Sequence, residues 1–285
     1  MARIVPGGGA LGARIEDIDL SQPLGDADIA ALRAALGAYG VLHVPGQSLE
    51  PAAHRAFAAR FGPLEINVAG SHQVPGVPEI MVLSNIVVDG RPIGFADAGQ
   101  GWHTDLSYSR TLALANVLHA VTVPRAHGRP LGNTEFANMQ AAAADLPPDI
   151  RARIGGRTAT HDFAKFWDMM RAEKGSTRPP LTPAQRATKP PVSHPILLTH
   201  PITGREVMFA DPGYTVRIDG MERDESDALL DILFAHQLQA KYRHVHHWNE
   251  GDVLLIDTIG TLHNAVADYG PDQPRLLRRC QVLAA

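Results

Sequence analysis

The chain has 285 residues, of which 45% are hydrophobic and 20% charged, and its formal net charge is −4. This composition is ordinary for a globular enzyme, and the lack of a basic excess argues against a nucleic-acid partner. We expect no membrane span and no secretion signal, because the sequence has no apolar run of spanning length and its first residues lack an apolar core. The single cysteine, Cys280, cannot form an internal disulfide, so we expect a cytoplasmic protein.

Helical and strand patterns alternate in the first part of the chain. An apolar stripe predicts a helix over 27–39, capped by Asp26 and ended by Gly40. The apolar run 41–44 then predicts a buried strand, and a second helix is expected to open at Ser48. These elements indicate an ordered core close to the start of the chain.

The rest of the chain shows mainly strands separated by turns. With 22 prolines and 26 glycines, and with no internal repeat or linker, it fits a single catalytic β domain over 1–285 with helices packed outside. Two irregular segments, 85–101 and 171–195, are expected to be lid loops. The remaining predicted elements are strands over 79–83, 112–123, 196–199, 206–209, 242–248, 252–256 and 275–283, and helices over 137–146 and 226–237.

A possible metal-binding motif lies in the middle of the chain. His103 and Asp105 are two positions apart, so on an extended segment both side chains point to the same face. His263 can supply a third ligand, and two histidines with one carboxylate form the facial arrangement of non-haem Fe(II) oxygenases. The same ligands suit Zn(II), so a zinc hydrolase is an alternative, as is a non-catalytic β-barrel that binds a small acid.

Several motifs together resemble the TauD/TfdA family of Fe(II)- and 2-oxoglutarate-dependent dioxygenases, and the likeness runs from about residue 15 to residue 282. The resemblance implies a mainly β fold with flanking helices around a double-stranded β-helix (jelly-roll, cupin-like) core, with the metal at its mouth. The motifs that carry it are Trp102-His103-Thr104-Asp105, Gly-Asn-Thr-Glu-Phe at 132–136, and His263 followed by Arg275 and Arg279.

The resemblance also assigns the cofactors. It implies that His103, Asp105 and His263 bind Fe(II). It further implies that Arg275 binds the distal carboxylate of 2-oxoglutarate with help from the hydroxyl of Thr134. A guanidinium suits this role because it can hold a carboxylate through two parallel hydrogen bonds. A surface arginine and an ordinary strand threonine are the alternative interpretations of these two positions.

For the substrate, the resemblance implies a small organic acid, namely a sulfonate, a sulfate ester, or an aryloxy or alkyl carboxylate. Arg279 would bind its anionic group, and Phe163 and Tyr214 would line the pocket. The alternatives are an arginine that pairs with a nearby acid and two aromatic core residues. The implied reaction hydroxylates the substrate while O2 and 2-oxoglutarate are converted to succinate and CO2. The resemblance also implies a homo-oligomer.

A second histidine cluster lies near the end of the chain, at His244, His246 and His247. His244 and His246 share one face of a predicted strand. No carboxylate or cysteine stands beside them at ligand spacing, so we expect solvated or core histidines there rather than a second metal site.

Overall fold

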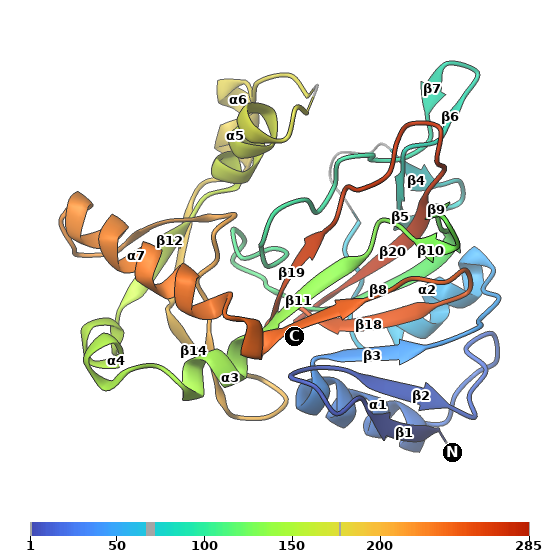
Figure 1. Ribbon diagram of the computed structural model, residues 1–285, viewed down its shortest axis with the longest axis horizontal. Coiled ribbons are helices and arrows are strands. Elements are labelled where there is room, and N and C mark those ends of the chain that lie inside the picture. The colour runs from blue at the N-terminus through green and yellow to red at the C-terminus, as the bar shows by residue number, and fades with distance from the viewer. Residues whose placement is uncertain (1, 67–71, 177, 285) are drawn as a thin grey trace.

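The computed structural model describes residues 2–66, 72–176 and 178–284, and its core consists of two β-sheets (Figure 1). The large sheet has the strand order β1-β2-β3-β18-β8-β20-β5-β4, in which all neighbours are antiparallel except β2 and β3. Its strands are β1 (Arg3–Pro6), β2 (Ala13–Glu16), β3 (Val41–Val44), β4 (Gln73–Val74), β5 (Val77–Ser84), β8 (Ala113–Thr122), β18 (Val253–Asp257) and β20 (Leu276–Leu283).

The small sheet faces the large one. It consists of β17 (Arg243–His246), β11 (Thr134–Asn138) and β19 (Thr261–Ala265), in this order and all antiparallel. Phe136 of β11 packs with Leu254 of β18 and with Leu277 of β20, which joins the two sheets through a shared apolar layer. This two-sheet arrangement is the predicted jelly-roll core.

The other face of the large sheet is covered by two helices, α1 (Asp26–Tyr39) and α2 (Pro51–Ala59). Strand β18 shows why the large sheet is apolar on both of its faces. Leu254 points into the layer between the sheets, while Leu255 packs with Leu32 and Leu36 of α1. Successive side chains of a strand point to opposite faces, so a strand buried on both sides is apolar throughout.

A second group of elements lies between β11 and β17 in the sequence and beside the core in Figure 1. Its strands form a three-stranded sheet β13-β12-β16 and a pair β14-β15. The members are α3 (Met139–Ala144), α4 (Pro148–Ile154), β12 (Thr158–His161), α5 (Phe163–Glu173), α6 (Pro183–Thr188), β13 (Val192–Pro195), β14 (Leu197–Thr199), β15 (Glu206–Met208), β16 (Thr215–Ile218), α7 (Arg223–Gln237) and a 3-10 helix η1 (Ala240–Tyr242).

The segments that we expected to be lids are more regular than predicted. Residues 85–101 contain a short hairpin, β6 (Val87–Val88) with β7 (Arg91–Pro92), and residues 171–195 contain α6 and β13. A similar hairpin, β9 (Arg125–Ala126) with β10 (Arg129–Pro130), precedes β11. Two-residue strands of this kind give almost no periodic signal in a sequence.

Some predicted boundaries are wrong for local reasons. Helix α1 begins at Asp26, with Gly25 rather than Asp26 at the N-cap position. Helix α2 begins only at Pro51, which fits the first turn because proline needs no hydrogen bond to its nitrogen there. Helix α3 starts at Met139 because the preceding residues pair as strand β11. Among the described residues, no helix is both long and apolar enough to cross a membrane.

Candidate active site

His103 and His263 are brought together by the backbone. His103 forms an isolated antiparallel bridge with His263 of β19, with N–H to carbonyl distances of 3.1 and 3.0 Å, and the two ring centroids lie 4.2 Å apart. The expected extended segment ends at this bridge. Asp105 lies in a turn, and Leu106 has a positive φ of 58°. The turn, rather than strand alternation, places the Asp105 carboxylate beside the imidazoles.

The three side chains present their donor atoms to a common point. Nε2 of His103 lies 3.6 Å from Oδ1 of Asp105, and Nε2 of His263 lies 3.9 Å from Oδ2, with all three residues buried or nearly so. The Nδ1 of His103 lies 2.7 Å from the carbonyl of Gly101, which can only accept a hydrogen bond, so the proton is on Nδ1. Its Nε2 therefore presents a lone pair to the carboxylate, as a metal ligand does.

The electrostatics favour the same protonation states. Burial, together with the nearby His103, lowers the pKa of His263 to about 3, so this imidazole is neutral. Burial alone would raise the pKa of Asp105, but the Arg279 guanidinium outweighs it, and the pKa lies well below its usual range. A neutral imidazole at His263 and an ionised carboxylate at Asp105 suit a divalent cation of the Fe(II) type.

Asp105 has two further partners that hold its carboxylate. Nδ2 of Asn116 donates a hydrogen bond to Oδ2 at 2.6 Å, and Nη1 of Arg279 donates to the same oxygen at 3.0 Å. The amide of Asn116 is itself oriented by Gln281, whose side chain donates to its oxygen at 3.1 Å. Arg279 therefore pairs with an acid, as one of the two sequence-based interpretations proposed.

Arg275 lies just before β20 and is only 7% exposed. Its Nη2 donates to the carbonyl of Gly132 at 3.0 Å, and its guanidinium lies over the ring of Tyr269 at 5.6 Å. Among the described residues no carboxylate forms an ion pair with Arg275 within 4 Å, although Tyr269 and the more distant charge of Asp268 act on its guanidinium. A buried cation normally has an anion in direct contact. Thr134 follows Gly132 closely, and its buried hydroxyl accepts a hydrogen bond from Nε1 of Trp248 at 3.0 Å.

An aromatic group lies beside His103. The ring of Phe166 lies 4.9 Å from that of His103, and the ring of Tyr214 stacks on Phe166 at 4.9 Å. Tyr108 lies 4.6 Å from Tyr214 and 5.0 Å from Phe163. Burial raises the pKa of both tyrosines, so they remain neutral. The structure thus brings Phe163 and Tyr214 to one wall beside the predicted ligands.

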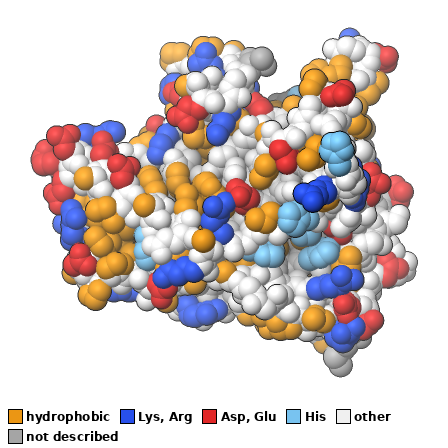
Figure 2. All heavy atoms as spheres, viewed as in Figure 1, with side chains coloured by type: hydrophobic (Ala, Val, Ile, Leu, Met, Phe, Trp, Pro, Cys, Tyr) orange, Lys and Arg blue, Asp and Glu red, His pale blue; other side chains and the backbone are white. Residues whose placement is uncertain are grey.

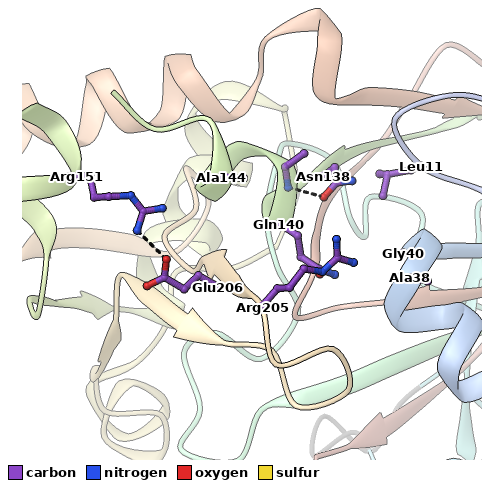
Figure 3. Close-up of a pocket in the computed structure, with 10 residues that line it drawn as sticks. Leu11, Ala38, Gly40, Asn138, Gln140, Ala144, Arg151, Arg205 and Glu206 are labelled. Atoms are coloured by element: carbon purple, nitrogen blue, oxygen red, sulfur yellow. Dashed lines mark hydrogen bonds and ion pairs between the residues drawn. The ribbon is translucent and has the colours of Figure 1, made fainter. Parts of the chain in front are cut away.

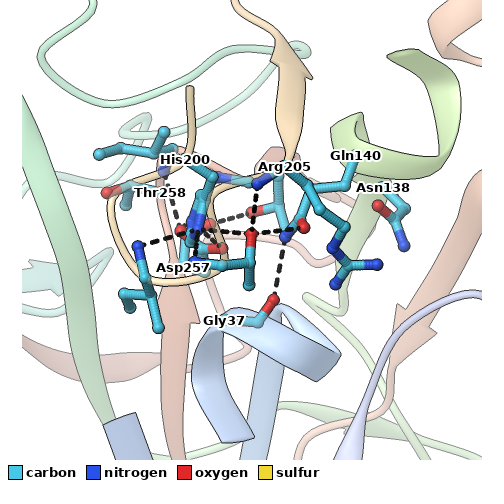
Figure 4. A network of polar contacts seen from close by, with 12 residues as sticks. Gly37, Asn138, Gln140, His200, Arg205, Asp257 and Thr258 are labelled. Carbon is cyan, nitrogen blue, oxygen red and sulfur yellow. Dashed lines mark hydrogen bonds and ion pairs between the residues drawn. The ribbon is translucent and has the colours of Figure 1, made fainter. Parts of the chain in front are cut away.

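The turn before β19 is fixed by a buried polar network (Figure 4). Oδ1 of Asp257 accepts the backbone N–H groups of Ile259 and Gly260, and Oδ2 lies 2.8 Å from Nε2 of the fully buried His200. This network sets the direction in which β19 leaves β18, and so places His263 on the small sheet. A separate cavity of about 320 Å³ contains none of the predicted site residues and is lined by Asn138 and Arg205, among others (Figure 3).

Sequence reasoning missed several residues of this region. Asn116 gave a usable signal, because it is a polar residue among the apolar residues of the first half of β8. Phe166 follows Phe163 by three positions, which places both on one helix face, but α5 itself was not predicted. Asp211 accepts hydrogen bonds from Ser107 at 3.0 Å and from the backbone N–H of Tyr214 at 2.8 Å. The residues around Asp211 in the sequence form no pattern that predicts these contacts.

Comparison with known proteins finds relatives that are similar to this chain in sequence and in fold. The family model described as "Taurine catabolism dioxygenase TauD, TfdA family" matches residues 3–281. The alpha-ketoglutarate-dependent 2,4-dichlorophenoxyacetate dioxygenase of Cupriavidus pinatubonensis is 32% identical over 281 residues, which cover 95% of this chain and 94% of the relative. The alpha-ketoglutarate-dependent sulfate ester dioxygenase of Pseudomonas putida is 30% identical, with 96% and 87% covered.

A solved structure extends the likeness to three dimensions. The crystal structure of AAD-2 in complex with Mn(II) and N-oxalylglycine superposes with a TM-score of 0.82 at 25% identity, covering 100% of this chain and 98% of that one. Fold and matches together define a dioxygenase that depends on Fe(II) and 2-oxoglutarate. The chain belongs to the TauD/TfdA family. The predicted family, jelly-roll core and enzyme class are confirmed, and the hydrolase and non-catalytic alternatives have no support.

Proposed function

We propose that His103, Asp105 and His263 hold Fe(II), and that the enzyme couples decarboxylation of 2-oxoglutarate to hydroxylation of a small organic acid. The bound metal would supply the oxidising chemistry with O2, while the protein binds, orients and shields the reactants. The mutual approach of the three donor atoms to within 4.8 Å, with Nε2 of His103 unprotonated, supports this assignment.

The observation that carries the proposal is the buried guanidinium of Arg275 without an acidic partner among the described residues. We assign it to the distal carboxylate of 2-oxoglutarate, with the hydroxyl of Thr134 beside it. Thr134 stands two positions from Phe136, which pairs directly with His263 across the small sheet. A zinc hydrolase would have no use for such an arginine. The binding of N-oxalylglycine by AAD-2 agrees with this role, because that molecule is also a dicarboxylate with an oxalyl end.

For the substrate we propose an acid with an aromatic or other apolar body. Arg279 would bind its anionic group, and Phe163 and Tyr214, together with Phe166, would contact its body. The relatives named for 2,4-dichlorophenoxyacetate and for sulfate esters support the choice of an anion with a non-polar body. Arg279 now pairs with Asp105, so it would exchange or share that partner when substrate binds.

The remaining parts of the proposal concern surroundings and assembly. We assign residues 1–285 to one catalytic domain and the segments 85–101 and 171–195 to lids over the site. Asp97 supports this, because it accepts a hydrogen bond from Ser176 and pairs with Arg178, which joins the two segments. We also propose a homo-oligomer, and the cytoplasm as its location, which the single free Cys280 supports.

The test is oxygen-dependent turnover. Protein loaded anaerobically with Fe(II) and then given O2 and 2-oxoglutarate should form succinate, and a matching sulfonate, sulfate ester or aryloxy acid from a panel should accelerate it. Arg275→Gln should raise the KM for 2-oxoglutarate by about 30-fold or more with a smaller change in kcat. Arg278→Gln is the matched control, because this neighbour on β20 bonds to the carbonyl of Leu49 instead. Absence of both succinate and 2-oxoglutarate binding contradicts the proposal.

A further inference from the structure

A second group of two imidazoles and one carboxylate lies apart from the candidate active site. It comprises His43 of β3, His246 of β17 and Asp252, which immediately precedes β18. Nε2 of His43 lies 2.8 Å from Oδ1 of Asp252, and Nε2 of His246 lies 3.3 Å from Oδ2. The three donor atoms lie within 4.8 Å of one another, as those of the first group do. Figure 2, which shows the molecule from the same side as Figure 1, shows several histidine side chains close together on the surface.

His246 is buried, as expected of a core histidine, but the sequence-based argument overlooked its carboxylate partner. Its carboxylate partner follows six positions later, after a turn in which the backbone N–H of Asn249 donates to Oδ2 of Asp252 at 2.7 Å. The second imidazole, His43, comes from the opposite end of the chain. The neighbours of His246 are not part of the group: His244 packs near Gly12 and Phe136, and His247 is exposed.

Among the described residues, the carboxylate of Asp252 forms ion-pair contacts only with His43 and His246, and with no lysine or arginine. This carboxylate is buried, and its two oxygens face the two imidazole nitrogens.

Nε2 of His43 and Oδ1 of Asp252 are within hydrogen-bond distance, at 2.8 Å, but the third donor atom of the group has no hydrogen-bond partner among the described residues. Nε2 of His246 is buried and makes no hydrogen bond in the part of the chain that the structure describes, although it faces Oδ2 of Asp252. A buried nitrogen left in this way is costly unless something fills the gap. The side chain of His43 is 24% exposed, which leaves a route to solvent on one side of the group.

We propose that His43, His246 and Asp252 form a second divalent-cation site, with Zn²⁺ as the ion that best fits its donors. Two imidazole nitrogens and one carboxylate oxygen are zinc ligands at about 2.0–2.2 Å, and the solvent side leaves a fourth position for water. Mg²⁺ and Ca²⁺ fit less well because they prefer oxygen ligands. This site is independent of the assignment of the first group to Fe(II).

The position of the site gives the cation a structural role. A cation at this site would join β3 of the large sheet to β17 of the small sheet. These two strands are not hydrogen-bonded to each other, because β3 lies between β2 and β18 and β17 pairs with β11. The ring of His246 also packs edge-on against Trp248 at 4.7 Å, and Nε1 of Trp248 donates to the hydroxyl of Thr134. A cation that fixes His246 therefore steadies the indole that orients Thr134.

The experiment separates the two sites by substitution. In a His103→Gln/His263→Gln background, which removes the first site, titration with Zn²⁺ should show one tightly bound equivalent per chain. Adding His43→Gln should abolish that equivalent, while adding His247→Gln, the exposed neighbour outside the group, should leave it in place. No bound equivalent in the folded background, or equal binding after His43→Gln, overturns the proposal.

A second measurement uses the protein with both sites intact. The unsubstituted chain should bind two equivalents of Co²⁺, and His43→Gln should bind one. In the double-substituted background, Zn²⁺ at about a hundred times its Kd should raise the Tm by about 5 °C, and His43→Gln should remove the rise. A stoichiometry that His43→Gln leaves unchanged contradicts the second site, whether or not the enzyme turns over 2-oxoglutarate.

Discussion

Asp105 is the residue on which the contacts of the candidate active site converge. It faces two imidazoles and accepts hydrogen bonds from Asn116 and Arg279 on one carboxylate oxygen. Such partners orient a ligand before the metal binds, and they matter to affinity nearly as much as the ligands themselves. The arrangement of Asn116 and Gln281 behind Asp105 is therefore part of the site and not only of the core.

Substitution of Asn116 should weaken metal binding. We expect Asn116→Ala to lower the affinity for Fe(II) by about 10- to 100-fold, because the carboxylate of Asp105 loses the 2.6 Å bond that fixes it. Equilibrium binding under anaerobic conditions measures this. Gln140→Ala is the control, since Gln140 is also buried and polar but bonds to Gly37 and Thr203. An unchanged affinity in folded Asn116→Ala would show that Arg279 alone holds Asp105.

At the scale of single residues, the sequence predicted the proposed ligands but not their support. His103, Asp105 and His263 stand in short motifs whose residue types already suggest metal chemistry. Phe166 acts through contacts between separate elements, which no local pattern reveals, and the polar residue Asn116 in an apolar run gave no hint of its partner Asp105. The group of Asp252, His43 and His246 was also not predicted, because these residues come together only through the order of the strands in the sheets.

Two segments expected to be lids behave as linked elements. The carboxylate of Asp97, in segment 85–101, contacts Ser176 and Arg178 of segment 171–195. The guanidinium of Arg178 also lies over the rings of Phe95 and Trp167, at 5.7 and 5.0 Å. We therefore expect movement of one segment to be coupled to movement of the other.

Breaking this link should loosen both segments together. Because partly exposed ion pairs contribute about 1 kcal/mol or less, Asp97→Asn should speed amide hydrogen exchange near residues 94–98 by up to about fivefold. The exchange near residue 178 should rise in parallel. Asp168→Asn serves as control, because Asp168 of α5 pairs with Arg186 of the second segment and does not reach the first. Exchange that rises in one segment alone would argue against coupling.

Element prediction succeeded where a pattern was long and failed where it was short. Helix α1 and strand β8 were recognised because an apolar stripe and an apolar run extend over several turns or many residues. The strands of the β13-β12-β16 sheet have only four residues each and mix polar with apolar side chains, so their tertiary pairing decides their state.

At the scale of the whole molecule, one buried histidine links stability to pH. His54 of α2 is fully buried, and its Nε2 bonds to the carbonyl of Val117 at 3.0 Å. Burial, with smaller effects of His119 and Arg278, lowers its pKa to about 4. Between the ordinary histidine pKa near 6.5 and pH 4, His54 is therefore protonated in the unfolded chain but neutral in the folded protein. Stability is complete above that pH and falls as the pH drops towards 4.

The loss should be measurable by urea unfolding. Between pH 7 and pH 5 the free energy of unfolding should fall by about 2 kcal/mol more in the unsubstituted protein than in His54→Gln, because the amide does not titrate but can still donate to Val117. His127→Gln, on an exposed hairpin, should leave the pH dependence unchanged. Equal slopes for the unsubstituted protein and His54→Gln would assign the acid sensitivity to other groups.

The overall architecture was predictable from the family resemblance, whereas the pairing of strands was not predictable from periodicity. The large sheet places β18 between β3 and β8, which come from distant parts of the sequence, and the small sheet places β11 between β17 and β19. Such long-range partners are chosen by the apolar layer between the sheets, to which both sheets contribute.

The bridge between His103 and His263 bears on when the protein can become metallated. During synthesis on the ribosome, the first histidine emerges long before its partner, and strand β19 finds its place only after β18 has entered the large sheet. The proposed ligand set is therefore incomplete in the nascent chain until β19 has been made. We expect iron to bind only after β18 and β19 have taken their places in the two sheets.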